Sequence, residues 1–495
     1  MIGNGKIYSD MSDRRGNLNS RVRRSIGWAG ASAVLQSIIQ FIYIVIISRL
    51  VEPSEFGVYI ILLISVGFFL MISRAGITML VVNRESIDQQ FLSTLFYLAL
   101  LISALSALIM YIVAPEIFKY FDYLDGDKYI TILSLLILFS NVNSVHEAIL
   151  QRKLLYFKLS IRDVVSQFFG STIGITVVYL YDAVLGLICT LFSILIIKAL
   201  ITWSTDSWRP RLLFVISECP IIFNNLVRMI GVSLTGYFTK SADKFLIGKV
   251  LGVGALGVYS MAFSIIVNPM HQLSILMSKV LFPAFSILNN ENKLKNQYKY
   301  LLFGQSLFIV PLLIFIALFP IELESFLFDD KWSGISDIIP YVAIIALMQA
   351  FQSTTGIVLM AIDRPKVLLR LSVGNLLIIL LLLLFFVEYG LVVVVKSYAV
   401  LSILMALVNL FIVWRLVKLP FLEGMGLIIP NIFYAVVAYY ATWPVQYLIM
   451  YYQYQSIATV LVLAIVFVIV YITLAFNIHK ELTKKIFSFL LRRNF

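Results

Sequence analysis

Long, unbroken apolar segments recur along the whole chain, and they constrain its fold more than any other feature of the sequence. Each is about as long as an α-helix that crosses a bilayer core roughly 30 Å thick. A membrane-spanning strand would alternate between apolar and polar residues instead. We therefore predict an all-α polytopic membrane protein with about fourteen transmembrane helices. They begin near residues 26, 58, 91, 129, 163, 184, 221, 256, 299, 337, 367, 391, 427 and 456.

The composition excludes several other classes of protein. With 61% hydrophobic and 13% charged residues and a mean hydropathy of +0.97, a water-soluble fold would leave large apolar surfaces uncovered. Two cysteines cannot form a disulfide framework or a cysteine-rich metal site, and we expect no metal. The net charge of +12 fits the excess of basic residues on the cytoplasmic side of a membrane protein, so we expect no nucleic-acid partner.

The distribution of basic residues predicts the orientation of the helices. Residues 1–25 are polar and basic, and the apolar stretch that follows is too long for a signal peptide. With fourteen spans and a cytoplasmic N-terminus, the connections assigned to the cytoplasm hold most of the lysine and arginine, while the two longest outer connections are acidic. We therefore predict that both termini are cytoplasmic.

Two distant segments are nearly alike. RLVEPSEFGVYIILL at 49–63 and KVLGVGALGVYSMAF at 249–263 share a basic residue, a turn-prone run and a Gly-Val-Tyr start to a new apolar segment. Six helices separate them, which predicts a parallel repeat of two six-helix lobes about an axis along the membrane normal. The alternative is a chance match in which glycine merely permits a turn. The predicted parts are a tail at 1–25, an N-lobe at 26–205, a linker at 206–220, a C-lobe at 221–418, two further helices at 426–478 and a tail at 479–495.

Two arginines lie within predicted spans, and charges there usually mark functional sites. Arg74 and Arg228 are each about eight residues, or roughly 12 Å, from the predicted cytoplasmic end of their helix, one in each lobe. A guanidinium stays charged and can hold a phosphate through two parallel hydrogen bonds. We expect both to line a cationic cavity. The alternatives are snorkelling or an ion pair with an acid such as Glu147, which is also a candidate for ion coupling.

The helix predicted at 221–250 is the least apolar of all. At 100° per residue, one stripe carries its polar side chains: Asn224, Arg228, Thr235, Thr239 and Asp243. We expect the stripe to line water or a substrate path, with Lys240 and Lys244 adding positive charge and Asp243 coupling an ion. The alternative is a neutralising pair between Lys240 and Asp243.

Several further polar residues lie within predicted spans. The run IIVNPMHQLSI combines Asn268 with a proline that kinks or hinges its helix and with His271, a candidate for proton coupling. Amides elsewhere suit sugar hydroxyls or simply bond neighbouring helices. These amides are Gln36, Gln40, Gln349 and Gln352.

The sequence lacks the motifs of nucleotide-hydrolysing enzymes and of zinc-dependent hydrolases. The sequence contains neither a Walker-type Gly-Lys-Ser/Thr loop nor His-Glu-x-x-His, and it offers no large extramembrane domain. We predict that the protein is not an enzyme, does not drive transport by its own ATP hydrolysis and uses no cofactor.

Short motifs along nearly the whole chain resemble bacterial polysaccharide exporters of the Wzx type, closest to the colanic acid branch. They include RLVEPSEFGVY, the Arg-Ala-Gly-Ile run at Arg74 followed by VVNRE, SKVLFPAFSILNNENKLKNQYKYLL and DRPKV. This family shares a superfamily with multidrug and toxin extrusion antiporters and with the lipid II flippase. The resemblance implies transport of an undecaprenyl-pyrophosphate-linked oligosaccharide to the outer leaflet of the bacterial cytoplasmic membrane. It further implies alternating access, coupling to an ion gradient and the polysaccharide polymerase machinery as a partner.

Two rival functions remain. A multidrug antiporter of the same superfamily would be expected to offer acidic groups to cationic drugs, whereas the charges within these spans are mainly basic. A membrane-embedded glycan polymerase or ligase would be expected to need a large outer loop with catalytic arginine or histidine, and the predicted outer loops contain no histidine.

Overall fold

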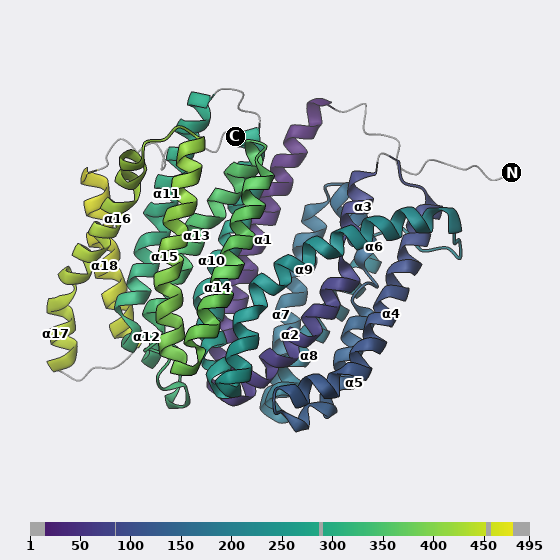
Figure 1. Ribbon diagram of the computed structural model, residues 1–495, viewed down its shortest axis with the longest axis horizontal. Coiled ribbons are helices and arrows are strands. Elements are labelled where there is room, and N and C mark those ends of the chain that lie inside the picture. Colours follow the sequence, from purple (N-terminus) through teal and green to yellow (C-terminus); the bar gives the residue numbers. More distant parts are fainter. Residues whose placement is uncertain (1–14, 85, 287–290, 452–456, 479–495) are drawn as a thin grey trace. The chain divides into compact units, whose positions relative to one another are not determined.

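Helices follow the apolar segments, because backbone groups inside a bilayer must hydrogen-bond within their own segment. The computed structural model describes residues 15–84, 86–286, 291–451 and 457–478 (Figure 1). Within these ranges every regular element is helical, and fourteen helical segments are long and apolar enough to cross a membrane. This confirms the predicted fold class and number of spans. The predicted terminal tails lie largely outside the described residues.

The chain forms two compact units, residues 1–257 and 258–495. The helices of the first unit are α1 (Arg15–Leu50), α2 (Pro53–Arg74), α3 (Ile77–Asn83), α4 (Gln89–Tyr120), α5 (Asp127–Phe139), α6 (Ser144–Arg152), α7 (Tyr156–Leu180), α8 (Ala183–Thr205) and α9 (Cys219–Val250), with short 3-10 turns η1 (Leu124–Gly126) and η2 (Ile216–Glu218). The first turns of α10 (Gly252–Ser286) also belong to this unit. Helix α9 packs against α2 and is therefore part of the first unit, whereas the predicted boundary between the lobes lies before it.

The second unit contains the rest of α10 and eight further helices. They are α11 (Glu291–Leu318), α12 (Pro320–Leu327), α13 (Ile339–Ala361), α14 (Pro365–Phe386), α15 (Leu391–Leu416), α16 (Phe421–Ala441), α17 (Trp443–Tyr451) and α18 (Ile457–Ile478), with 3-10 turns η3 (Asp330–Trp332) and η4 (Val387–Tyr389). A buried polar cluster joins three of these helices. The Asn431 amide donates to Ser306 Oγ (2.9 Å), and the Tyr471 hydroxyl donates to Asn431 Oδ1 (3.0 Å). These bonds satisfy groups that would otherwise be costly to bury.

Two adjacent spans of the first unit are interrupted partway along their length. Helix α2 ends at Arg74, and Gly76, with φ of 80°, turns the chain into α3. Helices α5 and α6 are separated at residues 140–143. The buried Asn141 amide bridges these breaks by donating to the Ser73 carbonyl and to Ser103 Oγ, both at 2.7 Å. Irregular backbone at membrane depth needs such internal partners, so the two interruptions stabilise one another.

The broken spans divide the hydrophobic core of the first unit into two clusters. One cluster gathers Val58, Val66, Met110 and Leu133, and the other gathers Ile77, Val81, Leu95, Val145 and Ile149. Between the two clusters lie the buried polar residues Ser73 on α2, Ser103 on α4 and Asn141 after α5, which meet through the Asn141 amide. A layer that contains buried polar groups therefore separates the two apolar clusters.

Candidate functional site

The crossing of α9 over the α2–α3 break brings the two predicted arginines to the same region of the first unit. Gly76 packs there so tightly that an added Cβ would come within 3.0 Å of Met229 Cγ. Arg74 lies two residues before Gly76, and Arg228 directly precedes Met229. Both arginines are exposed, and among the described residues neither forms an ion pair with an acid. Two arginines without an acidic partner among the described residues therefore lie close in sequence to one helix crossing.

A hollow of about 490 Å³ opens beside this crossing. Its walls combine apolar side chains with two amides and one pair of opposite charges. The lining residues are Gly76, Met79, Leu80, Asn83, Arg84, Phe91, Glu218, Ile222, Asn225 and Met229. The mixture suits a ligand that has both polar and apolar parts.

One side of the hollow is closed by an ion pair between Arg84 and Glu218. The guanidinium donates two hydrogen bonds of 2.9 Å, one to each carboxylate oxygen. Its carbon also lies 4.0 Å from the centre of the Phe91 ring. The pair is partly exposed, with side-chain exposures of 35% for Arg84 and 25% for Glu218. The hydrogen bonds that the guanidinium donates to Glu218 raise the pKa of Arg84, so the guanidinium remains charged.

Arg152 fixes the backbone that carries Arg84. It lies at the end of α6 and donates to the carbonyl oxygens of Val81 (2.6 Å), Val82 (3.3 Å) and Arg84. These are carbonyls at the C-terminal end of α3, where a helix leaves acceptors unsatisfied and favours a cation. The Asp88 carboxylate accepts from the backbone N–H of Phe91 (2.8 Å) and caps the start of α4.

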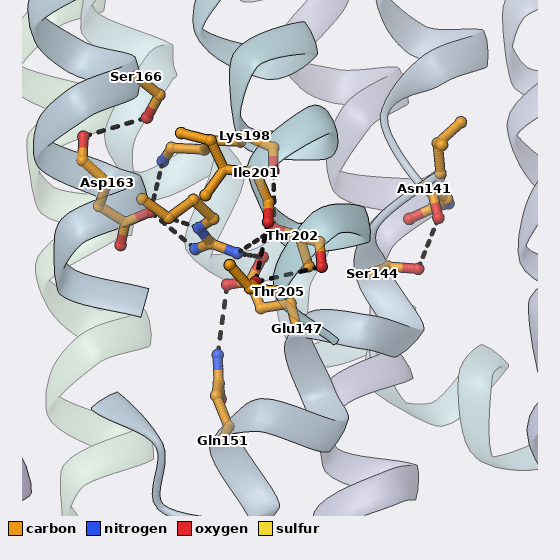
Figure 2. Close-up of polar contacts among 12 residues, drawn as sticks. Asn141, Ser144, Glu147, Gln151, Asp163, Ser166, Lys198, Ile201, Thr202 and Thr205 are labelled. Atoms are coloured by element: carbon orange, nitrogen blue, oxygen red, sulfur yellow. Dashed lines mark hydrogen bonds and ion pairs between the residues drawn. The ribbon is translucent and has the colours of Figure 1, made fainter. Parts of the chain in front are cut away.

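Glu147 lies in a buried charged group that joins α6, α7 and α8 (Figure 2). Arg162 is only 3% exposed, and its guanidinium lies 3.2 Å from Glu147 and 2.7 Å from Asp163. Lys198 on α8 approaches the same Asp163 oxygen at 3.3 Å. Glu147 is therefore paired with Arg162 within the first unit, not with Arg74 as one alternative had it.

Arg162 is not among the predicted site residues, because the sequence places it in a basic cytoplasmic connection just before the span that begins near residue 163. In the structure α7 begins at Tyr156, and Arg162 is one of its buried residues. The adjacent Asp163 was the only available sign that this cation has a partner nearby.

Of the other predicted residues on α9, Asn224 lies near its start and the rest lie toward its C-terminal end. Asn224 and Lys240 are exposed, whereas Asp243 and Lys244 are half-buried. The Asp243 carboxylate accepts a hydrogen bond of 2.8 Å from the Lys244 backbone N–H. The side chains of Thr235 and Thr239 lie outside the described residues, as does that of His271 on α10.

Two of the predicted amides join neighbouring helices. Gln167 on α7 donates to Gln40 Oε1 at 2.7 Å, and Gln349 on α13 donates to the Tyr398 hydroxyl at 3.3 Å. Gln36 donates to Ser32 one turn earlier in α1. Of the remaining two, Asn268 is exposed on α10 and Gln352 is half-buried on α13. These contacts favour interhelical bonding for Gln40 and Gln349.

The segment after α8 is bound to the start of α4. The indole N–H of Trp208 donates to Gln89 Oε1 (2.8 Å), the Arg211 N–H donates to Ser93 Oγ (3.1 Å), and the Val215 N–H donates to Thr94 Oγ1 (3.0 Å). The buried His146 packs beneath this segment, with its ring 4.8 Å from that of Trp208. The predicted linker is therefore fixed to the first unit over residues 208–215.

A second hollow, of about 340 Å³, lies in the second unit between α11 and α18. Its lining is apolar apart from one tyrosine. The residues are Leu307, Phe308, Pro311, Leu312, Phe315, Ala464, Phe467, Val468, Tyr471, Ile472, Ala475 and Phe476. Phe308 is 50% exposed and Val468 is 46% exposed, so the groove is open along its side.

Comparison with known proteins gives consistent matches. A family model described as "Polysaccharide biosynthesis protein" matches residues 46–337. The chain is 21% identical over 408 residues to the teichuronic acid biosynthesis protein TuaB of Bacillus subtilis (strain 168), covering 81% of this chain and 84% of TuaB. It is 24% identical over 278 residues to the succinoglycan biosynthesis transport protein ExoT of Rhizobium meliloti (strain 1021), covering 56% of each. The solved structure of the lipid II flippase MurJ in an inward closed conformation matches with a TM-score of 0.73 and 17% identity, covering 92% of this chain and 99% of MurJ.

Proposed function

The chain belongs to the polysaccharide biosynthesis protein family, and from this premise we propose that it is a flippase for lipid-linked oligosaccharides. Its cargo is a polyprenyl-diphosphate-linked repeat unit, carried from the cytoplasmic to the outer leaflet of the bacterial cytoplasmic membrane by alternating access. ExoT is named as a transport protein of succinoglycan biosynthesis, and the fold resembles that of MurJ, a lipid II flippase. Both similarities support this assignment. The family match confirms the resemblance found in the sequence.

The observation that carries the proposal is the pair of exposed arginines close in sequence to the crossing of α9 with α2 and α3, neither with an acidic partner among the described residues. A diphosphate cannot cross hydrocarbon without compensating positive charge. Guanidinium groups supply that charge at any physiological pH and bind phosphate oxygens in pairs. Arg74 and Arg228 lie close in sequence to Gly76 and Met229, which line a hollow with amide and apolar walls that suits a head group combining phosphate with sugar.

The apolar groove between α11 and α18 suits the polyprenyl tail. Its walls offer aliphatic and aromatic carbon over about 340 Å³, and it is open along one side. A prenyl chain gains little by leaving lipid for such a groove, but the groove can orient it. In this assignment the tail stays at the lipid-facing surface while the head group moves through the protein. The polymerase machinery then receives the repeat unit at the outer face.

The test is a flipping assay with purified protein in liposomes that contain a fluorescent polyprenyl-diphosphate oligosaccharide. Arg228→Ala should reduce the initial rate at least tenfold, because it removes a charge-assisted contact from the path of the head group. Arg415→Ala is the matched control, since Arg415 is an exposed arginine at the end of α15. An unchanged rate in Arg228→Ala, or an equal loss in the control, contradicts the proposed role.

A multidrug antiporter would respond differently in the same assay. Its cationic substrates would be repelled by Arg74 and Arg228, so replacing either arginine should raise drug transport. Drug efflux by the wild-type protein, with no flipping of the lipid-linked sugar, would favour that alternative.

A further inference from the structure

The ion pair between Arg84 and Glu218 forms one wall of the hollow, yet the proposed transport does not require it. We propose that Arg84 is a further head-group contact and that Glu218 holds it in the absence of cargo. The diphosphate of the cargo replaces the Glu218 carboxylate on the guanidinium. This inference rests on the proposed function, because it takes the diphosphate as the ligand.

The geometry of the pair matches the chemistry of the exchange. Arg84 donates two bonds of 2.9 Å to the two oxygens of one carboxylate. A phosphate group accepts the same pair of parallel hydrogen bonds from a guanidinium. The carboxylate therefore occupies the positions that two phosphate oxygens would take. The pair is partly exposed to water, so a ligand with more negative charge can reach the guanidinium and displace the carboxylate.

The Arg84 side chain is held in place independently of Glu218. The Phe91 ring lies 4.0 Å from the guanidinium carbon, and Arg152 binds the backbone carbonyl of Arg84. The nearby Asp88 carboxylate is engaged with the Phe91 N–H. Exchange therefore changes the partner of Arg84 without first having to order the arginine, which lowers the entropic cost of binding.

The surroundings of the pair also fit a diphosphate ester. Asn83 and Asn225 line the same hollow and can donate amide N–H groups to phosphate or sugar oxygens. The volume of about 490 Å³ lies within the range of small-molecule sites. The predicted topology places Arg84 and Glu218 in cytoplasmic connections, the side from which the cargo is loaded.

The exchange also links loading to α9. Glu218 lies in η2, immediately before the first residue of α9, the helix that carries Arg228. When the diphosphate takes Arg84, the start of α9 loses its ion pair with the connection between α3 and α4. We expect the beginning of α9 to become less protected from hydrogen exchange on loading.

The experiment compares variants whose effects on affinity should have opposite signs. Farnesyl diphosphate serves as the probe, and its binding to the full-length protein in nanodiscs is measured by calorimetry. Glu218→Gln removes the competing charge and should tighten binding about two- to fivefold. Arg84→Gln should weaken binding about tenfold, and Arg84→Lys should fall between it and the wild type because a single ammonium cannot make the parallel pair.

A structural role alone would give a different pattern. If the pair only holds helices together, both variants should lose thermal stability and both should bind the probe less tightly. Weaker binding in Glu218→Gln overturns the proposal, as does unchanged binding in Arg84→Gln. The control is Lys249→Gln, which breaks the ion pair of 2.9 Å with Asp122 and has a similarly exposed basic side chain (33%). It should leave the affinity for the probe unchanged.

Two further ligands separate this inference from the proposed function. Inorganic pyrophosphate should compete with the probe, and farnesol should not, because the diphosphate is the group recognised. Equal competition by farnesol overturns the inference. Failure of the wild type to bind farnesyl diphosphate counts against the proposed cargo itself. Binding that is lost in Arg228→Ala but unchanged in both Arg84 variants rejects the exchange alone.

Discussion

Gly57 and Gly257 contact each other backbone to backbone where α2 crosses the first turns of α10. A Cβ on Gly57 would overlap the carbonyl oxygen of Val253, and a Cβ on Gly257 would overlap that of Pro53. Each added Cβ would also lie 3.1 Å from the backbone nitrogen of the other glycine. In both cases the blocked carbonyl lies four residues earlier in the partner helix. The two Gly-Val-Tyr segments therefore contact each other at equivalent positions within the first unit.

This contact predicts a stability effect that depends on position. Gly57→Ala should lower the free energy of unfolding by about 1–3 kcal/mol, because the helices must separate to admit the methyl group. The measurement is a fluorescence melt of the purified protein in detergent.

The control for this contact lies in the same turn of α10. Gly254→Ala introduces the same methyl group where no atom lies within 4 Å of the new Cβ, so it should melt like the wild type or slightly above it. A Gly57→Ala protein with wild-type stability would show that the crossing is looser than described.

The buried group around Arg162 predicts a large cost for removing its cation. Arg162→Met removes a buried cation from the partly exposed carboxylates of Glu147 and Asp163 and leaves only Lys198 beside Asp163. We expect a loss of about 3–5 kcal/mol in the free energy of unfolding, with partial recovery in the triple variant Arg162→Met, Glu147→Gln, Asp163→Asn. Chemical denaturation in mixed micelles measures both.

A surface pair in the same unit provides the comparison. Lys128→Met breaks the ion pair with Asp182, in which the lysine is 56% exposed and the distance is 3.4 Å. This change should cost less than about 1 kcal/mol. Equal losses in Arg162→Met and Lys128→Met would mean that Arg162 is hydrated and not a structural cation.

Asp243 is the candidate residue for coupling transport to an ion gradient. If its carboxylate binds the coupling ion, Asp243→Asn should make the flipping rate independent of the proton and sodium gradients while some flipping remains. Flipping in liposomes with imposed gradients of each ion measures this. Asp122→Asn, which changes an exposed acid outside the candidate spans, should keep the wild-type dependence. A full dependence in Asp243→Asn would assign coupling to another residue.

The sequence predicts the helices and the repeat because both depend on local properties. The number of spans follows from segment length and hydropathy, and the relation between the Gly-Val-Tyr starts follows from counting helices between them. The sequence also predicts that Arg74 lies inside a span, and the structure places it within the candidate span Pro53–Asn83. The break at Gly76 was not predicted, since the apolar run resumes directly after the short Ser-Arg-Ala-Gly stretch at 73–76 and a single glycine does not by itself end a helix.

The buried network around Arg162 depends on contacts between helices that the sequence does not specify. Glu147, Arg162 and Lys198 lie on α6, α7 and α8, and only packing brings them together. The same holds for Arg84 and Glu218, which are separated by 134 residues. Asn141 could have been predicted as a contact residue, because an amide in the middle of an apolar span needs hydrogen-bond partners.

The attachment of residues 208–215 to α4 bears on the construction of hybrids between members of this family. A splice at residue 206 would replace Trp208 while keeping Gln89, and a different residue at position 208 would leave the Gln89 amide oxygen without its indole donor. A junction placed after Val250 would keep residues 208–215 together with the residues of α4 that bind them. Hybrids joined at that later point should therefore insert and mature more efficiently, whichever cargo the grafted half prefers.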